Sequence, residues 1–159
     1  MNNVYLLLGA NLGNPSQQLQ SAAKMVAQQL GNIIAQSALY RSEAWGVEEQ
    51  PDFYNQVLSV ETDHTARETL HICQHIENTL GRIRKEKWGA RVIDIDILYF
   101  NTEIIDSDDL KVPHPYLHLR RFTLLPLTEI APNFVHPILG NTNEELLAQC
   151  PDTLSVFKI

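Results

Sequence analysis

Apolar positions along the chain follow two spacings, which predicts a mixture of strands and helices. Short apolar runs bounded by Gly, Pro, Asn or charged residues are typical of β-strands. Four such runs are predicted as strands, at residues 4–9, 33–41, 53–61 and 92–100. Residues 15–30 and 66–80 instead repeat apolar side chains every three or four positions, which predicts two amphipathic helices.

Local signals mark the ends of both helices. Asn14 stands directly before a proline, and this pair is typical of a helix N-cap and first turn. Gly31 follows the first helical pattern and suits a C-terminal cap. Thr65 and Glu68, three positions apart, predict a capping box at the start of the second helix, and Gly81 closes it. Both helices are therefore predicted with defined ends.

The predicted elements run β, α, β, β, α, β, followed by a C-terminal extension. A hairpin is expected around Asn101 and Thr102, and a short helix near residues 143–149. This order predicts an α+β fold with a ferredoxin-like βαββαβ core: an antiparallel sheet with helices packed on one face and additions at the C-terminus. The length of 159 residues suits a single domain, residues 1–159.

One predicted strand contains two acidic residues, Asp94 and Asp96. Side chains two positions apart point to the same face of a strand, so these carboxylates share one face and the isoleucines beside them share the other. Two neighbouring carboxylates raise at least one pKa unless a cation lies between them. Mg²⁺ is held by one or two carboxylates together with substrate phosphates. A solvated strand face is the simpler explanation of so short a pattern, so the surrounding residues must decide.

The distribution of charge bears on this question. The formal net charge of −7 disfavours binding of nucleic acid or an acidic membrane over the whole surface. Five of the 12 Lys and Arg residues nevertheless lie within residues 82–91, directly before the acidic pair. A solvated charge run is one explanation. An acidic metal-binding pair beside a basic loop is also what a polyphosphate substrate requires.

Other features of the sequence predict location and packing. The apolar run Val4–Leu8 is too short for a membrane span or a signal-peptide core, which favours a cytoplasmic protein. Cys73 and Cys150 lie far apart without metal-type spacing and are expected to pack. His71 and His75 are spaced as a possible metal pair on a helix, but without a third ligand an exposed pair is the better interpretation. Surface or capping explanations suffice for the remaining histidines at 64, 118 and 136.

The segment "KWGARVIDIDIL" resembles the signature of the 6-hydroxymethyl-7,8-dihydropterin pyrophosphokinase family. Five further segments resemble that family in the same order along the chain: "LLLGANLGN", "LYRSEAWGVEEQPDFYNQV", "IENTLGRIR", "VPHPYLHLRRFTLLPLTEIAP" and "HPILGNTNEELL". The resemblance implies an ATP-dependent diphosphotransferase of folate biosynthesis. It implies transfer of pyrophosphate from ATP to the hydroxymethyl group of a reduced pterin, with release of AMP. It further implies two Mg²⁺ ions held by Asp94 and Asp96, and a monomer without nucleic-acid or membrane partners.

The resemblance also implies roles for individual residues. The catalytic set is Arg82, Arg84, Arg91, Asp94 and Asp96. The nucleotide-binding set is Gln74, Glu77, Arg84, Trp88, Arg91, Ile97, His114 and Arg120. The pterin-binding set is Ser42, Glu43, Trp45, Phe53, Asn55, Trp88 and Phe122. Arginine pairs bidentately with phosphate oxygens, and aromatic walls with an amide suit a flat ring.

Some residues of these sets can also be explained by the packing of the fold, without a ligand. Phe53 and Phe122 would be read as ordinary core packing if they stood alone. Glu77 lies on the inward stripe of its helix, where a carboxylate needs a partner.

Two other functions remain open from the residues themselves. A ferredoxin-like nucleic-acid-binding module would use the basic loop, but it would leave the paired carboxylates unexplained, since carboxylates repel phosphates without a metal. A metal-dependent nucleotidyl or phosphoryl transferase with another acceptor would share the acidic pair but would need no aromatic slot.

Overall fold

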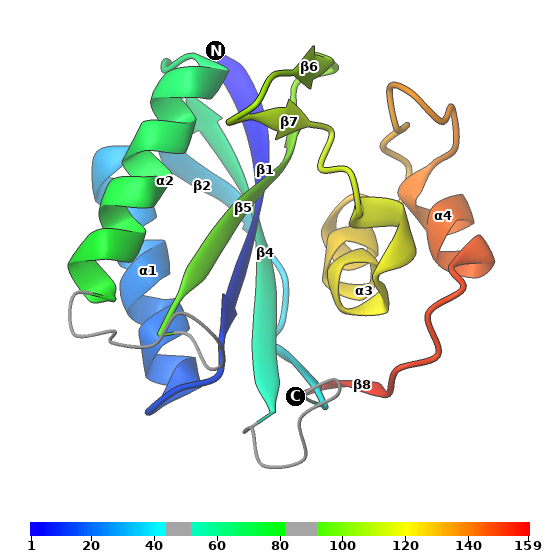
Figure 1. The fold of residues 1–159 in the computed structure, drawn as a ribbon, viewed down its shortest axis with the longest axis horizontal. Coiled ribbons are helices and arrows are strands. Elements are labelled where there is room, and N and C mark those ends of the chain that lie inside the picture. Colours follow the sequence, from blue (N-terminus) through cyan, green and yellow to red (C-terminus); the bar gives the residue numbers. More distant parts are fainter. Residues whose placement is uncertain (44–51, 82–91) are drawn as a thin grey trace.

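The computed structural model describes residues 1–43, 52–81 and 92–159, and its centre is an antiparallel sheet with helices on both faces (Figure 1). The sheet comprises β1 (Asn2–Ala10), β2 (Asn32–Gln36), β3 (Tyr40–Ser42), β4 (Phe53–Thr62), β5 (Asp94–Phe100) and β8 (Val156–Lys158). The helices are α1 (Pro15–Gln29), α2 (Ala66–Leu80), α3 (Arg121–Ile130) and α4 (Asn143–Gln149). A separate two-stranded sheet joins β6 (Ile105–Asp106) to β7 (Lys111–Val112), and a 3₁₀ turn spans Leu117–Leu119.

The strand order is β5-β1-β4-β3-β8, and β2 also pairs with β4. This order, with α1 and α2 on one face, confirms the predicted ferredoxin-like core. The buried residues of β1, β4 and β5 divide between two separate cores, one on each face of the sheet. Leu6 and Ile95 belong to the core under α1 and α2, whereas Leu7 and Leu98 belong to the core under α3 and α4. The C-terminal additions thus cover the second face of the sheet (Figure 1).

The predicted helix starts are confirmed. The side chain of Asn14 accepts a hydrogen bond from the backbone N–H of Gln17 at 3.2 Å, and Thr65 with Glu68 forms a complete capping box. Gly31 lies one residue beyond the observed C-cap of α1. A Cβ atom there would lie 2.0 Å from the carbonyl oxygen of Glu61. Close approach to β4 is therefore the reason for glycine at this position.

The predicted strand over residues 33–41 is divided into β2 and β3. Ser37 lies between them, where its N–H donates to the carbonyl of Val57 and its Oγ accepts from the N–H of Val57. The register against β4 shifts by one residue across this point, from Gln36 opposite Leu58 to Tyr40 opposite Asn55. A serine hydroxyl that bonds to the backbone competes with the regular ladder, which explains the interruption.

The expected hairpin at residues 101–102 is only a turn. Asn101 has a positive φ of 50°, but the strand that follows, β6, pairs with β7 and not with β5. The turn bonds instead to β1, because Asn101 N–H donates to the carbonyl of Asn3 and the Asn101 side chain accepts from Asn3 N–H. The turn is therefore held by hydrogen bonds to β1, and the strand after it does not form a hairpin with β5.

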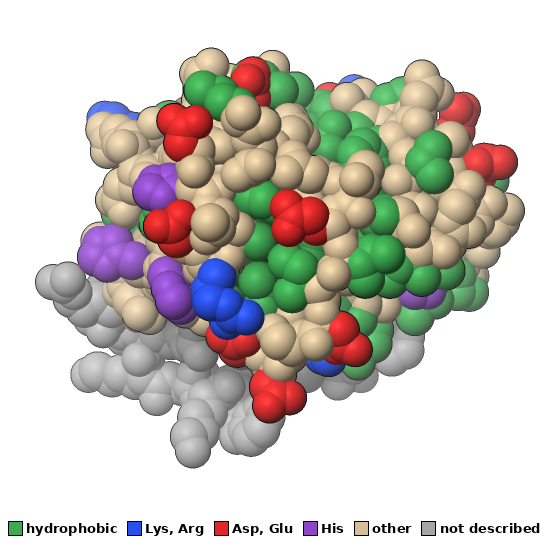
Figure 2. Space-filling model, turned by 90° about the horizontal axis from the view of Figure 1, so that it is seen from above, with side chains coloured by type: hydrophobic (Ala, Val, Ile, Leu, Met, Phe, Trp, Pro, Cys, Tyr) green, Lys and Arg blue, Asp and Glu red, His purple; other side chains and the backbone are tan. Residues whose placement is uncertain are grey.

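Three further observations concern the helices, the surface charge and one histidine. Within the described residues, no helix is long and apolar enough to cross a membrane. Viewed from the end of the molecule where β6 and β7 lie, acidic side chains are more widespread than basic ones, as the net charge of −7 leads one to expect (Figure 2). Of the two explanations expected for His136, surface exposure is wrong and a capping role is supported. His136 is buried, and its Nδ1 accepts hydrogen bonds from the backbone N–H groups of Ile138 and Leu139.

Candidate active site

A cavity of about 540 Å³ opens on the face of the sheet that α3 covers. Its walls come from four strands, the start of α3 and the C-terminal segment. The lining residues are Leu7, Gly9, Ser42, Glu43, Phe53, Asn55, Asp94, Asp96, Arg120, Phe122, Asp152 and Leu154. The pairing of strands distant in sequence therefore brings most of the described pterin-binding candidates together with the acidic pair.

The sheet register explains how these residues meet. Gly9 on β1 lies opposite Asn55 on β4 and opposite Asp94 on β5. Leu7 lies opposite Asp96 in the same way. Directly opposed residues of antiparallel strands have Cα atoms about 4.5–5.5 Å apart. The amide and the two carboxylates consequently occupy one patch of the sheet surface.

Gly9 makes room for the amide of Asn55. A Cβ atom at Gly9 would lie 2.6 Å from Asn55 Nδ2. The Asn55 side chain is buried against the strand, and its Nδ2 donates to the carbonyl of Leu8 at 3.5 Å. Gly9 is not among the site residues predicted from the sequence. The signal that could have found it is a glycine within an apolar strand, which often marks close approach of another group.

Asp94 and Asp96 lie on the same face of β5 and are half-buried, as the alternation predicted. Between them, the backbone N–H of Ile95 donates to Glu77 Oε2 at 2.8 Å, so the inward carboxylate of α2 has the partner that its position requires. Burial raises the pKa of the Cys73 thiol to about 12, and the charges of Glu77 and Asp96 add to this effect. The Cys73 thiol therefore stays protonated at neutral pH.

The donor set fits magnesium. Within residues 1–43, 52–81 and 92–159, no group of three or more His, Cys, Asp or Glu side chains is placed to hold a metal ion. Mg²⁺ does not need such a group, because it commonly takes one or two protein carboxylates and completes its shell with water and phosphate oxygens. Asp94 and Asp96, which share one face of β5, supply hard oxygen ligands of this kind.

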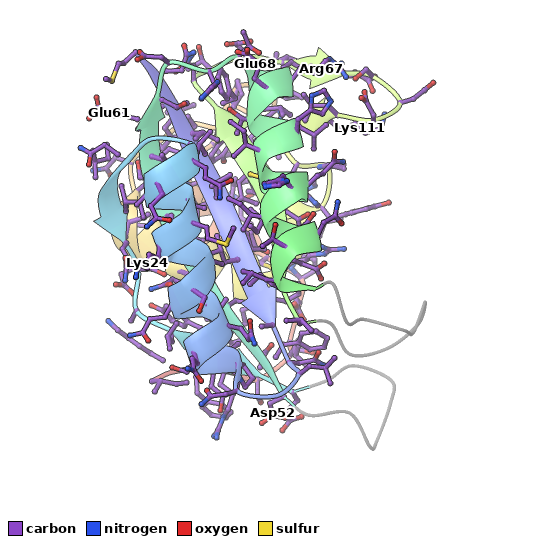
Figure 3. All side chains as sticks on the ribbon, turned by 90° about the vertical axis from the view of Figure 1, so that its left-hand side faces the viewer. Lys24, Asp52, Glu61, Arg67, Glu68 and Lys111 are labelled. Atoms are coloured by element: carbon purple, nitrogen blue, oxygen red, sulfur yellow. The ribbon has the colours of Figure 1, made fainter. Side chains whose placement is uncertain are left out.

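A second cavity, of about 250 Å³, lies between α2, β5 and the β6–β7 loop. It is lined by Leu70, Ile95, Asp96, Ile97, Asp108, Asp109, Leu110, Lys111, His114 and Pro115. Asp96 lines both cavities. The β6–β7 loop is attached to α2 through the ion pair of Arg67 with Asp109, and Arg67 and Lys111 lie at the same end of the molecule (Figure 3). The ion pair between Arg67 and Asp109 therefore holds one wall of the second cavity against α2.

His114 in the second cavity is neutral at physiological pH. Burial lowers its pKa to about 4, and the nearby charge of Arg120 contributes. Its Nδ1 accepts from the backbone N–H of Tyr116 at 3.2 Å, which leaves Nε2 as the N–H donor of the neutral ring. The Arg120 guanidinium lies 5.1 Å from the ring centroid of Tyr116 and 5.6 Å from that of Phe122. Arg120 thus lies in a cation–π arrangement beside the larger cavity.

The remaining candidate residues fall into two groups. Gln74 is exposed on α2 and lines neither cavity. The others lie outside the described residues: Trp45, Arg82, Arg84, Trp88 and Arg91, together with the rest of the basic loop. The structure also adds Leu7, Asp152 and Leu154 to the larger cavity. No sequence signal pointed to Asp152, because its place depends on the path of the C-terminal segment.

Comparisons with known proteins agree on one family. The sequence model of the family described as 7,8-dihydro-6-hydroxymethylpterin-pyrophosphokinase (HPPK) matches residues 5–132. A protein of Aquifex aeolicus named 2-amino-4-hydroxy-6-hydroxymethyldihydropteridine pyrophosphokinase is 43% identical over 157 residues, which cover 99% of this chain and 96% of the relative. The protein of the same name from Haemophilus influenzae is 40% identical over 139 residues. This match covers 86% of this chain and 86% of the relative.

Some similar proteins are much longer than this chain. The folic acid synthesis protein FOL1 of Dictyostelium discoideum is 40% identical over 158 residues, but the match covers only 24% of its length. A crystal structure of HPPK-DHPS from Plasmodium falciparum has a TM-score of 0.76 and 21% identity, and the match covers 93% of this chain and 41% of that one. This second likeness shows the fold. Because the family model and the bacterial relatives span most of the sequence, the chain belongs to the 7,8-dihydro-6-hydroxymethylpterin-pyrophosphokinase family.

Proposed function

We propose that the chain transfers pyrophosphate from ATP to the hydroxymethyl group of 6-hydroxymethyl-7,8-dihydropterin and releases AMP. Membership of the family and the pyrophosphokinase names of its bacterial relatives support this activity, a step of folate biosynthesis. The observation that carries the proposal is that two cavities of different chemistry meet at Asp96. A transfer reaction needs its donor and acceptor on either side of one such point.

The larger cavity suits the reduced pterin. Phe53 and Phe122 provide aromatic surfaces, and the buried amide of Asn55 offers both donor and acceptor to the edge of a flat heterocycle. Ser42 and Glu43 line the wall at the end of β3. Ligand sites of this kind combine apolar walls with a few placed polar groups, which supports a pterin at this position.

The smaller cavity suits the nucleotide. Leu70 and Ile97 provide apolar contact for a purine or ribose, while the Nε2–H of neutral His114 and the ammonium of Lys111 can donate to oxygen atoms. Arg120 lines the adjoining cavity and carries a permanent planar charge that pairs with phosphate. We propose that ATP enters here with its triphosphate directed toward Asp96.

Asp94 and Asp96 would hold two Mg²⁺ ions in this proposal. When bound, magnesium would neutralise the triphosphate and favour an in-line arrangement of attacking and leaving oxygens. The hydroxymethyl oxygen forms a bond to the β-phosphorus while the bond from that phosphorus to the α-phosphate oxygen breaks. The hydroxyl proton is released and AMP departs. Both carboxylates are presented by one strand, so their positions are set by the backbone of β5.

The predicted arginines extend this mechanism. Arg82, Arg84 and Arg91 stay predictions for phosphate binding and loop closure, since they lie outside the described residues. We also propose that residues 1–159 form one domain that acts as a monomer in the cytoplasm.

Substitution of the acidic pair tests the proposed function. We expect Asp96→Ala, and likewise Asp94→Ala, to abolish AMP formation from ATP and the reduced pterin, because each removes a magnesium ligand while leaving β5 paired. Asp63→Asn changes an exposed carboxylate that lines neither cavity and should keep wild-type turnover. Turnover would be measured by chromatographic detection of AMP. Magnesium-dependent activity in both alanine variants would reject the proposal.

A further inference from the structure

The C-terminal segment forms one wall of the larger cavity. Asp152 and Leu154 line that cavity, and β8 pairs with β3 so that Val156 lies opposite Ser42. In Figure 1 this segment leaves α4 and runs past α3 back to the sheet. The family match ends at residue 132, so this wall is built by a part of the chain beyond it.

Asp152 is bonded to the first residue of α3. Its Oδ2 accepts from the backbone N–H of Arg121 at 3.0 Å, and its Oδ1 accepts from the N–H of Leu154 at 2.9 Å. Arg120, the N-cap of α3, makes no side-chain capping bond. Asp152 therefore accepts the N–H of the first helical residue, one of the N-terminal N–H groups that have no partner within a helix, and its negative charge is favourable at a helix N-terminus.

The residues next to Arg121, whose N–H makes this bond, belong to the larger cavity. Arg120 and Phe122 flank Arg121 in the chain, and both line the larger cavity. They also contact one another, with the Arg120 guanidinium 5.6 Å from the Phe122 ring centroid. A shift of the start of α3 would move the aromatic wall and the guanidinium together.

We propose that Asp152 is a positioning residue for the pterin. Through the N–H of Arg121 it holds Phe122 and Arg120 at the distance from the sheet that the ring requires. The inference rests on the proposed function, because it takes the occupant of the larger cavity to be the reduced pterin. Small displacements of positioning groups lower binding and turnover strongly in enzymes of this kind.

Two variants of Asp152 distinguish the effect of its hydrogen bond from the effect of its negative charge. Asp152→Ala should weaken binding of the reduced pterin about tenfold, because the start of α3 is no longer held where Phe122 and Arg120 contact the ring. Asp152→Asn keeps an acceptor oxygen and is an equally good cap, so it should bind within about threefold of wild type. Isothermal titration would be performed with the pterin in the presence of a non-hydrolysable ATP analogue, and with the analogue alone. The affinity for the analogue should fall less than the affinity for the pterin, because the analogue occupies the other cavity and Arg120 is the one group positioned by Asp152 that is proposed to pair with its phosphates.

The donor can be removed independently. Arg121→Pro deletes the N–H that Asp152 accepts, and proline suits the first position of a helix. The preceding residue, Arg120, has φ −122° and ψ 113°, which proline tolerates before it. This variant should lose pterin affinity as Asp152→Ala does, whereas Arg121→Ala keeps the N–H and should bind normally. The double variant Asp152→Ala with Arg121→Pro should be no weaker than either single variant.

Thr142→Ala is the matched control for lost stability. Thr142 caps α4 by accepting from Glu145 N–H, and it does not line the larger cavity. It should lower the thermal midpoint without weakening pterin binding. If Asp152→Ala does not fold, the two Arg121 variants decide the question.

Three results would overturn the inference: unchanged pterin affinity in Asp152→Ala, equal loss of pterin and analogue, or an Asn variant as weak as the Ala variant. Failure of the wild-type protein to bind pterin would instead overturn the proposed function.

Discussion

Gly9 and Asn55 show how closely single residues of the candidate site depend on one another. The amide of Asn55 occupies space that any side chain at Gly9 would take, since an added Cβ would lie 2.6 Å from Nδ2. Gly9 is paired with Asn55 on β4 and, as the last pair of the β1–β5 ladder, with Asp94, so its backbone is held from both sides. The orientation of the Asn55 amide therefore depends on the absence of a side chain on β1.

Gly9→Ala should reduce pterin affinity by roughly tenfold or more, because the amide must rotate or the strands must separate. Binding of a non-hydrolysable ATP analogue should be retained, since Gly9 does not line the smaller cavity. Isothermal titration with each ligand measures both effects. Equal affinity of wild type and variant for the pterin would mean that the Asn55 amide does not contact the ring.

His114 makes a second residue-level contribution, to the dependence of stability on pH. Its pKa is lowered from 6.5 to about 4, first by burial and then by the charge of Arg120. The unfolded chain therefore binds a proton at a pH where the folded chain does not. The contribution of neutral His114 to the free energy of unfolding is fully present above about pH 6.5, and it is lost as the pH falls toward 4.

The variant His114→Gln, which cannot be protonated, should show a smaller loss of unfolding free energy between pH 7 and pH 4 than the wild type. Urea denaturation followed by circular dichroism at several pH values provides the measurement. Parallel curves for the two proteins would show that protonation of His114 does not oppose folding.

The strands and helices differ in how well local sequence predicted them. The start of α2 was predictable because a capping box involves residues only three positions apart, Thr65 and Glu68. The break at Ser37 was not, because it depends on a bond to Val57, 20 residues away. The start of α3 carries no capping side chain of its own and relies on Asp152, 31 residues further along the chain. Elements that are completed by distant partners give no local signal of their ends.

The arrangement of the whole molecule joins the two cavities. Because β1 lies between β4 and β5, it brings the amide of Asn55 and the carboxylates of Asp94 and Asp96 onto one surface. The described lining of the larger cavity is rich in carboxylates: Glu43, Asp94, Asp96 and Asp152 accompany the single guanidinium of Arg120 among those residues. In a chain of net charge −7, such a surface repels a triphosphate unless cations are bound.

Removal of magnesium should consequently weaken ATP binding by at least about tenfold. Adenosine, which carries no phosphate, should bind equally well with Mg²⁺ and with EDTA, and it serves as the internal control. Isothermal titration of both ligands under both conditions gives the comparison. An ATP affinity that EDTA leaves unchanged would contradict the role proposed for Asp94 and Asp96.

The amino-acid sequence by itself determined the alternation of β5, the amphipathic faces of α1 and α2, the capping of their first turns and the resemblance to one family. These features depend on neighbours within a few positions, or on motifs that keep their order along the chain. Only the tertiary structure decided that Gly9 faces Asn55, that Asp96 borders two cavities and that Asp152 holds α3. The reason is that strand pairing and packing bring together residues far apart in the sequence, and the local pattern of side chains does not specify which segments meet.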